Sequence, residues 1–151
     1  MAKILVLSGP NLNLLGEREP QHYGTTTLAE LVALARETAA KFGHDVEHVQ
    51  SNHEGALIDA IHGARGTCAA IVINAGAFTH YAYAITDALA MFEGVKIEVH
   101  LSNPYAREGW RHQSVISPVV DGSITGLRAE GYRLAIEAVA ARLAEAGGAR
   151  P

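Results

Sequence analysis

Short apolar runs of strand length recur along the chain, and they limit the fold more than any other feature of the sequence. The runs K-I-L-V-L-S at 3–8 and A-A-I-V-I-N at 69–74 are continuous, whereas those at 45–50 and 95–101 alternate between apolar and polar residues. Strands that are apolar on both faces are typical of parallel sheets, because helices cover both sides of such sheets. The sequence therefore predicts a parallel sheet that includes these four segments.

Segments with helical periodicity separate the predicted strands. The patterns T-x-x-E at 27–30 and S-x-x-E at 51–54 are typical of capping boxes, and each predicts the start of a helix. Two further helices are expected at about 81–92 and 129–146 from the spacing of their apolar residues. Alternating strands and helices at this spacing predict right-handed crossovers between parallel strands.

Five strands in this order predict a flavodoxin-like α/β fold, with a three-layer, doubly wound, parallel five-stranded sheet of strand order 2-1-3-4-5. The fifth strand is the least clearly marked, because Pro118 interrupts the segment 114–120, and we place this strand near 123–127. A single domain is expected over 1–146, followed by a flexible tail at 147–151.

Composition and charge argue against several kinds of partner. The 151 residues carry a formal net charge of −4 and the basic residues are scattered, so neither nucleic acid nor a membrane is an expected partner. The apolar part of the N-terminus is too short for a signal peptide, and no segment approaches a membrane span. Cys68 is the only cysteine, which makes a reducing compartment the simpler assumption. We therefore expect a cytoplasmic protein.

Motifs for common cofactors and nucleophiles do not occur in the sequence. Neither G-x-x-x-x-G-K-[ST] nor G-x-G-x-x-G is found, which argues against a phosphate cradle or a dinucleotide site. A G-x-S-x-G nucleophile elbow is also missing, and a response regulator would need acidic residues where Ser8 and Asn74 stand. The histidines lack metal-ligand spacing and there is no C-x-x-C. We therefore expect neither a cofactor nor a metal.

Polar side chains gather after three strands that should be neighbours. Ligands of doubly wound folds bind outside the carboxyl ends of the strands, where the strand order reverses. The polar residues at these ends are Asn11, Arg18 and Tyr23 in the loop 8–24, Asn74 and His80 after the third strand, and His100, Ser102, Arg107 and Arg111 after the fourth. The loop 8–24 is long for a connection between a strand and a helix, which favours a lid or a binding loop. This convergence predicts the functional site.

Each of these residues also has a simpler explanation when it is taken alone. An asparagine at a strand end can cap a turn, and Asp87 can be an exposed carboxylate of its helix. Arg107 and Arg111 can form one solvated face of a short helical turn, and Trp110 between them is expected to be a packing anchor. The functional interpretation depends on the convergence of these residues and not on any single one.

Glu98 and His100 lie two residues apart, so a strand would place the carboxylate and the imidazole on the same face. Burying such a pair costs on the order of several kcal/mol unless the two groups are paired and hydrogen-bonded. A neighbouring carboxylate can fix the tautomer of an imidazole and favour its protonated form, which can then donate a proton. A satisfied core histidine is the alternative, and we interpret the pair as functional.

At these residues the sequence resembles the type II 3-dehydroquinate dehydratases, which are small, metal-free dehydroquinases. The matching segments are L-S-G-P-N-L-N-L-L-G-E-R-E-P-Q-H-Y-G at 7–24, Q-S-N-H-E-G at 50–55, N-A-G-A-F-T-H at 74–80, E-V-H-L-S-N at 98–103, A-R-E-G-W-R at 106–111 and G-Y at 131–132. The resemblance covers nearly the whole chain. Ala82, Tyr83 and Thr86 depart from the Ser, Val and Arg that are common in the family, whereas Asp87 is retained. These departures bear on subunit contacts made by the helix and little on the chemistry.

The resemblance implies a hydro-lyase of the shikimate pathway or of quinate breakdown. The reaction would be the anti elimination of water from 3-dehydroquinate through an enolate, which gives 3-dehydroshikimate without a Schiff base. Tyr23 would be the base that takes the proton next to the ketone, and Arg18 would stabilise the tyrosinate. His100, held by Glu98, would protonate the departing hydroxyl, and Asn11 would help to hold the water or oxygen at the enolate.

Further residues would bind the substrate or complete the site. The substrate-binding residues that the resemblance implies are Asn74, His80, Asp87, Leu101, Ser102 and Arg111. Asp87 would reach the site of a neighbouring subunit, because the family assembles as trimers within dodecamers, so a homododecamer built of trimers is expected. From the residues alone, Arg107 or Arg111 could approach Tyr23 from the fourth strand.

Two other functions stay open on the residues alone. One is a flavodoxin-like module that holds a flavin or a small anion without chemistry. The other is an assembly protein whose polar groups at the strand ends stabilise contacts between subunits.

Overall fold

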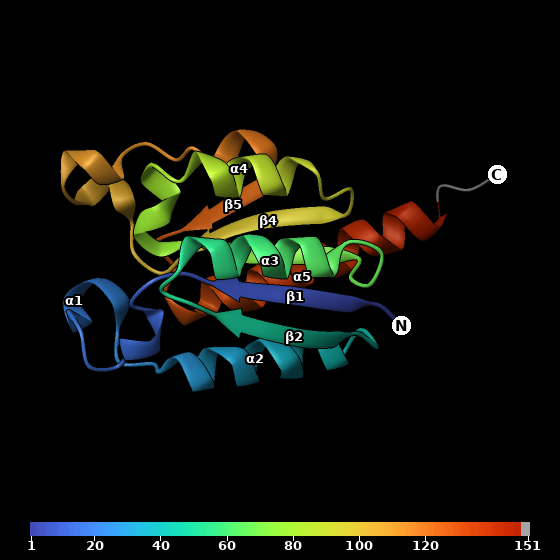
Figure 1. The fold of residues 1–151 in the computed structure, drawn as a ribbon. Helices are drawn as coiled ribbons and strands as arrows, with labels where there is room; N and C mark the ends of the chain where they lie inside the picture. The colour runs from blue at the N-terminus through green and yellow to red at the C-terminus, as the bar shows by residue number, and fades with distance from the viewer. Residues whose placement is uncertain (149–151) are drawn as a thin grey trace.

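Five parallel strands form the sheet at the centre of the computed structural model, which describes residues 1–148 (Figure 1). In chain order the strands are β1 (Lys3–Ser8), β2 (Asp45–Gln50), β3 (Ala70–Asn74), β4 (Val95–His100) and β5 (Gly122–Thr125). Their order across the sheet is β2-β1-β3-β4-β5, and each neighbouring pair is parallel. The predicted fold class and strand order are confirmed.

Two pairs of helices cover the two faces of the sheet and complete the three layers (Figure 1). The helices α2 (Leu28–Ala40) and α5 (Ala129–Gly148) pack together on one face, and α3 (Glu54–Ala64) and α4 (Tyr83–Ala90) pack together on the other. The helix α5 continues to Gly148, so the first two residues of the predicted flexible tail are helical. The rest of that tail, 149–151, lies outside the described residues.

Each central strand supplies alternate side chains to two separate cores. The core beneath α2 and α5 includes Val6, Val72, Leu31, Tyr132 and Ile136, and the core beneath α3 and α4 includes Leu7, Ile73, Leu57, Ile61 and Leu89. Both faces of β1 and β3 are therefore buried, which explains why their sequences are continuously apolar.

Of the two helix starts predicted from these patterns, the one at Thr27 is confirmed and the one at Ser51 is wrong. The hydroxyl of Thr27 accepts the N–H of Glu30 at 3.2 Å, as expected for the N-cap of α2. The helix α3 instead begins after His53, and the hydroxyl of Ser51 accepts the N–H of that residue at 2.9 Å. The backbone N–H of Ser51 donates to the carbonyl of Ser8, which extends the β1–β2 ladder past the end of β2. The chain is therefore still paired with β1 at this residue, and the N-cap of α3 follows at His53.

The connections at the carboxyl ends of the strands contain short helical turns. The predicted helix at 81–92 is shorter than expected, because a 3₁₀ turn, η2 (Gly76–His80), precedes α4. The loop after β1 contains η1 (Leu12–Leu14) and the single-turn helix α1 (Pro20–Tyr23). The segment between β4 and β5 contains η3 (Pro104–Ala106), η4 (Gly109–Arg111) and η5 (Ser117–Val119). Most of the irregular chain is therefore concentrated at one end of the sheet.

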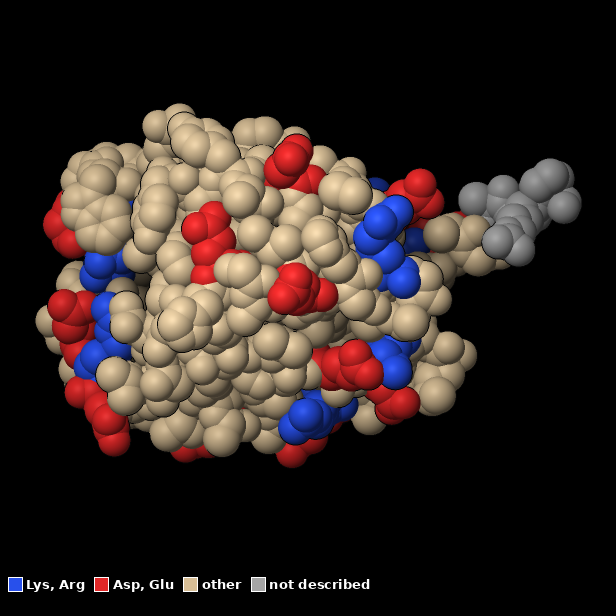
Figure 2. Space-filling model, in the orientation of Figure 1, with Lys and Arg blue, Asp and Glu red and all other residues tan. Residues whose placement is uncertain are grey.

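Charged side chains are distributed over the surface without a basic stripe on the face that carries α3 and α4 (Figure 2). Basic and acidic side chains lie side by side at the edge where α1 is found. Within residues 1–148, none of the helices combines the length and the apolar character that crossing a membrane requires.

The loops after β1 and β3 approach each other most closely at Gly9. The N–H of Gly9 donates to the carbonyl of Asn74 at 2.7 Å, and a Cβ atom at Gly9 would lie 2.2 Å from the carbonyl oxygen of Ala75. Only a residue without a side chain fits between these two backbones.

We expect Gly9→Ala to lower the free energy of unfolding by about 1–3 kcal/mol or more, because the neighbouring atom is backbone and cannot move aside alone. Gly63→Ala, in α3, is the matched control, since a Cβ atom there meets nothing within 4 Å. That control should raise the free energy of unfolding by up to about 1 kcal/mol. Urea denaturation of the three proteins measures both effects, and a Gly9→Ala variant as stable as the control would contradict the close approach.

Candidate active site

A pocket opens at the carboxyl ends of β1, β3 and β4, where the strand order reverses. Its lining includes every predicted site residue except Glu98 and Asp87: these are Asn11, Arg18, Tyr23, Asn74, His80, His100, Leu101, Ser102 and Arg111. It also includes Pro10, Leu12, Gly76, Ala77, Pro104 and Arg107. Residues that are up to about 100 positions apart in the chain therefore meet in one pocket.

Tyr23 ends the short helix α1, and its ring is almost completely buried. The helix is possible because Pro20 occupies its first turn and because Glu19 and Gly24 on either side have positive φ angles of 30° and 76°. This local conformation turns the phenol back over the pocket and does not leave it in solvent. A conformation that is unfavourable for Glu19 indicates that the surrounding contacts determine the course of the loop.

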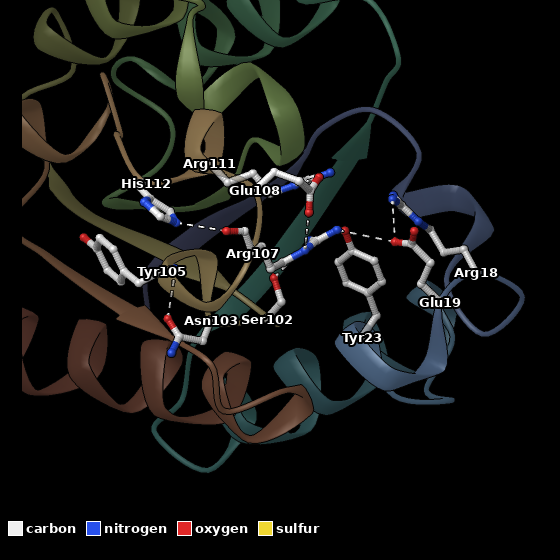
Figure 3. A network of polar contacts seen from close by, with 10 residues as sticks. All are labelled: Arg18, Glu19, Tyr23, Ser102, Asn103, Tyr105, Arg107, Glu108, Arg111 and His112. Atoms are coloured by element: carbon white, nitrogen blue, oxygen red, sulfur yellow. Dashed lines mark hydrogen bonds and ion pairs between the residues drawn. The ribbon is translucent and has the colours of Figure 1, made fainter.

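Two guanidinium groups lie beside the phenol of Tyr23 (Figure 3). Arg107 donates a hydrogen bond from Nη1 to the hydroxyl at 2.6 Å, and the Cζ atom of Arg18 lies 4.4 Å from the ring centroid. The two arginines come from different segments, Arg18 from the loop after β1 and Arg107 from the segment after β4.

Arg107 connects the loop after β1 to the segment after β4. Its side chain is only 4% exposed, and it also donates to the hydroxyl of Ser102 at 3.3 Å and pairs with the Oε2 atom of Glu19 at 3.4 Å. The Nε atom of Arg107 is buried without a hydrogen-bond partner. The sequence left open whether Arg107 or Arg111 approaches Tyr23, and the four-residue spacing of the two arginines fits a solvated pair equally well. In the structure Arg107 is the one that reaches the phenol.

Arg111 lies at the rim of the same pocket and does not contact Tyr23. Its Nε atom donates to the Oε2 atom of Glu108 at 3.0 Å, and its Cζ atom lies 4.0 Å from the ring of Trp110. Trp110, the expected packing anchor, is 53% exposed and does not enter the core. Its indole instead packs edge-on against the ring of His80 at 5.4 Å and supports two lining residues from outside. None of the residues of the 3₁₀ turn η4 is buried, which leaves the indole at the surface.

Glu98 and His100 form a close ion pair on the same face of β4. The Nε2 atom of His100 donates to the Oε2 atom of Glu98 at 2.6 Å, and Glu98 is 2% exposed. The hydroxyls of Ser114 and Ser117 donate to the same carboxylate at 2.9 and 2.6 Å. Three donors therefore satisfy the buried charge, and the Nδ1 atom of His100 stays available to the pocket.

The hydrogen bonds of Glu98 determine its protonation. Burial has the largest effect and pushes the pKa of the carboxyl upward, but His100, Ser117 and Ser114 together outweigh it and leave the pKa below its ordinary value of 4.5. The carboxylate is thus charged near neutral pH and can balance a positive charge on His100. Ser114 and Ser117 were not predicted, because they lie in an irregular segment whose path only the fold defines.

Asn74 and His80 present polar atoms from the segment that follows β3. The Oδ1 atom of Asn74 accepts the N–H of Gly76 at 3.2 Å, and the Nδ1 atom of His80 donates to the carbonyl of Gln113 at 2.7 Å. Burial lowers the pKa of His80 below its ordinary value of 6.5, although the hydrogen bond to Gln113 opposes this shift. A neutral His80 with its hydrogen on Nδ1 leaves Nε2 able to accept a hydrogen bond from a ligand hydroxyl.

Asn11 is held from behind by the segment that follows β2. Its φ angle of 68° is in the left-handed region, which asparagine tolerates, and its N–H donates to the Oδ1 atom of Asn52 at 3.0 Å. Gln50 donates to the carbonyl of Gly9 at 3.2 Å. The segment 50–55 therefore supports the loop after β1, a role that the sequence did not indicate.

Asp87 does not belong to the pocket of its own chain. It lies on the exposed side of α4, in a shallow surface hollow with Tyr83, Thr86 and Val119.

The pocket of this chain is lined by imidazole, phenol, hydroxyl, amide and guanidinium groups, and the carboxylate of Glu98 lies behind the imidazole of His100. Among residues 1–148, no three His, Cys, Asp or Glu side chains are grouped so that they could hold a metal ion. A small anionic ligand in this pocket can contact two groups. One is the phenol of Tyr23 with its two arginines, and the other is the imidazole of His100 with its carboxylate partner. Such a set is suited to moving two protons in one reaction.

Comparison with known proteins gives consistent results. The model of the family Dehydroquinase class II matches residues 2–140. The 3-dehydroquinate dehydratase of Corynebacterium glutamicum (strain R) is 53% identical over 140 residues, which cover 93% of this chain and 97% of that protein. The 3-dehydroquinate dehydratase of Bacillus licheniformis is 55% identical over 136 residues, 90% of this chain and 94% of that protein.

Solved structures agree with the sequence comparison. The type II dehydroquinase of Propionibacterium acnes superimposes with a TM-score of 0.89 at 47% identity, over 93% of this chain and 97% of that one. The type II dehydroquinase of Butyrivibrio crossotus gives the same TM-score at 49% identity, over 91% and 97% of the two chains. From its sequence and its fold, the chain belongs to the class II dehydroquinase family.

Proposed function

We propose that this chain is a 3-dehydroquinate dehydratase, a hydro-lyase that eliminates water from 3-dehydroquinate to give 3-dehydroshikimate. The observation that carries the proposal is the presence, in one pocket, of the Arg107-bound hydroxyl of Tyr23 and of His100 paired with Glu98. Membership of the class II dehydroquinase family favours this function over the binding module and the assembly protein.

Tyr23 acts as the base. Its phenolate takes the proton from the carbon next to the ketone, and the electron pair of that C–H bond moves toward the ketone oxygen to give an enolate. Arg18 and Arg107 stabilise the phenolate before the transfer, because both carry positive charge beside the ring. Asn11 helps to hold the enolate oxygen, either directly or through a water molecule.

His100 acts as the acid in the second step. As the enolate collapses, the carbon–carbon double bond forms, the C–O bond to the departing hydroxyl breaks, and His100 supplies the proton that makes water. Nδ1 makes this transfer, a role that is supported by the engagement of Nε2 with Glu98. Glu98 stays ionised throughout and holds the ring in place, as a carboxylate does for a catalytic imidazole.

The remaining lining residues bind the substrate. Asn74 and His80 contact its hydroxyl groups, and the backbone N–H groups of Leu101 and Ser102 together with the fork of Arg111 bind its carboxylate. The short helix α1 closes this arrangement from above and excludes water from the reacting carbons. We place the reaction in the cytoplasm, in the shikimate pathway or in quinate breakdown.

The working assembly is a homododecamer of trimers, in which Asp87 reaches the substrate of a neighbouring subunit. The exposed position of Asp87 on α4, beside the 70% exposed ring of Tyr83, supports a contact at this face. The hydroxyl of Thr86, in the same hollow, is bound within its own chain, because it donates to the carbonyl of Val115 at 2.9 Å.

Tyr23→Phe tests the base. The purified chain should convert 3-dehydroquinate to a conjugated enone, which is followed by its ultraviolet absorbance. The variant should lose roughly 10³-fold in kcat with KM changed little, because only the proton acceptor is removed. Tyr105→Phe is the matched control, an exposed tyrosine of the segment after β4, and it should keep full activity. No enone from the wild-type chain would refute the function, and an active Tyr23→Phe variant would refute the base.

Glu98→Gln tests the charge state of the buried pair. Because the folded pKa of Glu98 lies below 4.5, its ionisation stabilises the fold above that value, and this contribution is lost as the pH falls through the folded pKa. The variant should therefore be less stable than the wild type by about 1–3 kcal/mol near neutral pH. The difference should shrink as the pH falls below 4.5. Urea denaturation from pH 7 to pH 3 measures it, and a difference that is constant with pH would contradict the ionised carboxylate.

Mixing two inactive variants tests the role of Asp87. Tyr23→Phe and Asp87→Ala chains should each be nearly inactive alone. Unfolded together and refolded, they should form mixed trimers in which an intact Tyr23 faces an intact Asp87 of the next subunit, and activity should return. Light scattering should give a mass near twelve times the 16.0 kDa chain. If mixing restores nothing although the assembly forms, Asp87 acts within its own chain or not at all.

A further inference from the structure

Two serine hydroxyls of the segment between β4 and β5 contact the buried carboxylate of Glu98. Ser114 lies 2.9 Å from Oε2, the same oxygen that faces the Nε2 atom of His100 at 2.6 Å. Ser117 lies 2.6 Å from the other oxygen, Oε1. The carboxylate oxygen that shares a hydrogen with His100 is therefore also in contact with a second group, the hydroxyl of Ser114.

Two backbone groups determine which way the hydroxyl of Ser114 points. The N–H groups of Ile116 and Ser117 both donate to its Oγ atom, at 3.2 and 3.0 Å, and a backbone N–H can only donate. Both lone pairs of the hydroxyl are then occupied, so its hydrogen is left for the Oε2 atom of Glu98. Ser114 is therefore a donor to the carboxylate and cannot accept a hydrogen from it.

The segment that carries Ser114 is fixed by the core. Val115 and Ile116 are 8% and 0% exposed, and both pack in the core beneath α3 and α4. The N–H of Val115 donates to the carbonyl of Thr79 at 2.8 Å, which ties the segment to the turn η2. Ser114 is thus held against Glu98 by residues that do not line the pocket.

A group that can only donate makes one protonation state of the Glu98–His100 pair unfavourable. When the shared hydrogen is on Nε2 of His100, the charged Oε2 accepts from both His100 and Ser114. When it is on Oε2, that atom belongs to a neutral acid, and the bond from Ser114 weakens because bonds to a charged acceptor are about twice as strong as neutral ones. The pKa of Glu98, which His100, Ser117 and Ser114 hold below 4.5 against the effect of burial, agrees with the first state.

Ser114 is better placed than any other group to control this hydrogen. Ser117 contacts only Oε1 and is exposed, so water can replace its hydroxyl. In the part of the chain that the structure describes, neither Glu98 nor His100 is hydrogen-bonded to the other titratable groups of the pocket, which are Arg18, Tyr23, His80, Arg107 and Arg111.

We propose that Ser114 is a positioning residue that keeps the hydrogen shared by Glu98 and His100 on the imidazole. A ring with hydrogen on both nitrogens can give up the one on Nδ1, whereas a neutral ring beside a neutral acid is a far weaker acid at the same atom. Ser114 acts on the departing hydroxyl only through Glu98 and His100. The inference rests on the proposed function, because it concerns the acid of that reaction.

Ser114→Ala removes the hydroxyl and tests the role directly. We expect kcat for enone formation to fall about tenfold or more with KM within about twofold of the wild type, because the groups that bind the substrate are untouched. In deuterated water, exchange of the hydrogen next to the ketone should stay within about threefold of the wild type, because that step uses Tyr23 and not His100.

Ser123→Ala is the matched control, since Ser123 is an exposed serine of β5 that pairs in register with Glu98. It should keep both rates of the wild type. A pocket that is merely distorted would lose exchange and enone formation together. An unchanged kcat in Ser114→Ala, or an equal loss of the two rates, overturns the proposal.

The hydrogen on Nε2 of His100 gives a second test that does not depend on turnover. In protein labelled with ¹⁵N-histidine, the signals of His100 are identified by their loss in His100→Gln. As the pH rises, the Nδ1 signal should move to the value of a nitrogen without hydrogen, while the Nε2 signal should keep the value of one that carries hydrogen. In Ser114→Ala the Nε2 signal should lie closer to that of a nitrogen without hydrogen than it does in the wild type.

The wild-type spectrum decides the proposal even where Ser114→Ala does not fold, because an Nε2 atom without hydrogen in the wild type would place the hydrogen on Glu98 and overturn it. A wild-type chain that is inactive toward 3-dehydroquinate but shows the expected signals would refute the proposed function and leave the position of the hydrogen supported.

Discussion

The parallel pairing of β3 with both β1 and β4 is the constraint on which the site depends. Because the three strands run in the same direction, their carboxyl ends lie at one edge, and each of the following loops must begin there. Gly9 then allows the first two loops to touch through backbone alone. The pocket follows from this arrangement, since its lining comes almost entirely from the residues that leave these three strands.

The ionisable groups around the pocket form two separate sets, and within each set the charged side chains have hydrogen-bond partners. Arg107 joins the phenol of Tyr23 to the carboxylate of Glu19, while Glu98 joins the imidazole of His100 to two serine hydroxyls. Within each set a buried charge has a partner of opposite charge and further hydrogen bonds, which is the condition under which a protein tolerates such burial. The first set provides positive charge beside a phenol, and the second provides negative charge beside an imidazole. The first set is therefore suited to accepting a proton, and the second is suited to donating one.

Several polar residues act on the site only through others. Asn52 holds the backbone of Asn11, and Ser114 and Ser117 hold Glu98. Tyr132 contacts Asn74 from the opposite side of the lining, through the core beneath α5. A pocket built by loops becomes rigid through such contacts, because each lining side chain then has few orientations left.

The sequence by itself determined the layers, the strand order and most of the residues that line the pocket. Continuous apolar strands such as 69–74 require cover on both faces, and polar residues after neighbouring strands must meet at one edge, so local pattern and topology suffice for these conclusions. Only the tertiary structure decided that Arg107 and not Arg111 reaches Tyr23, that Trp110 stays at the surface, and that Ser51 extends a ladder when its sequence predicts a cap. The reason is physical: each of these outcomes depends on contacts between segments distant in the chain, and the path of an irregular segment has no periodicity from which such contacts could be read.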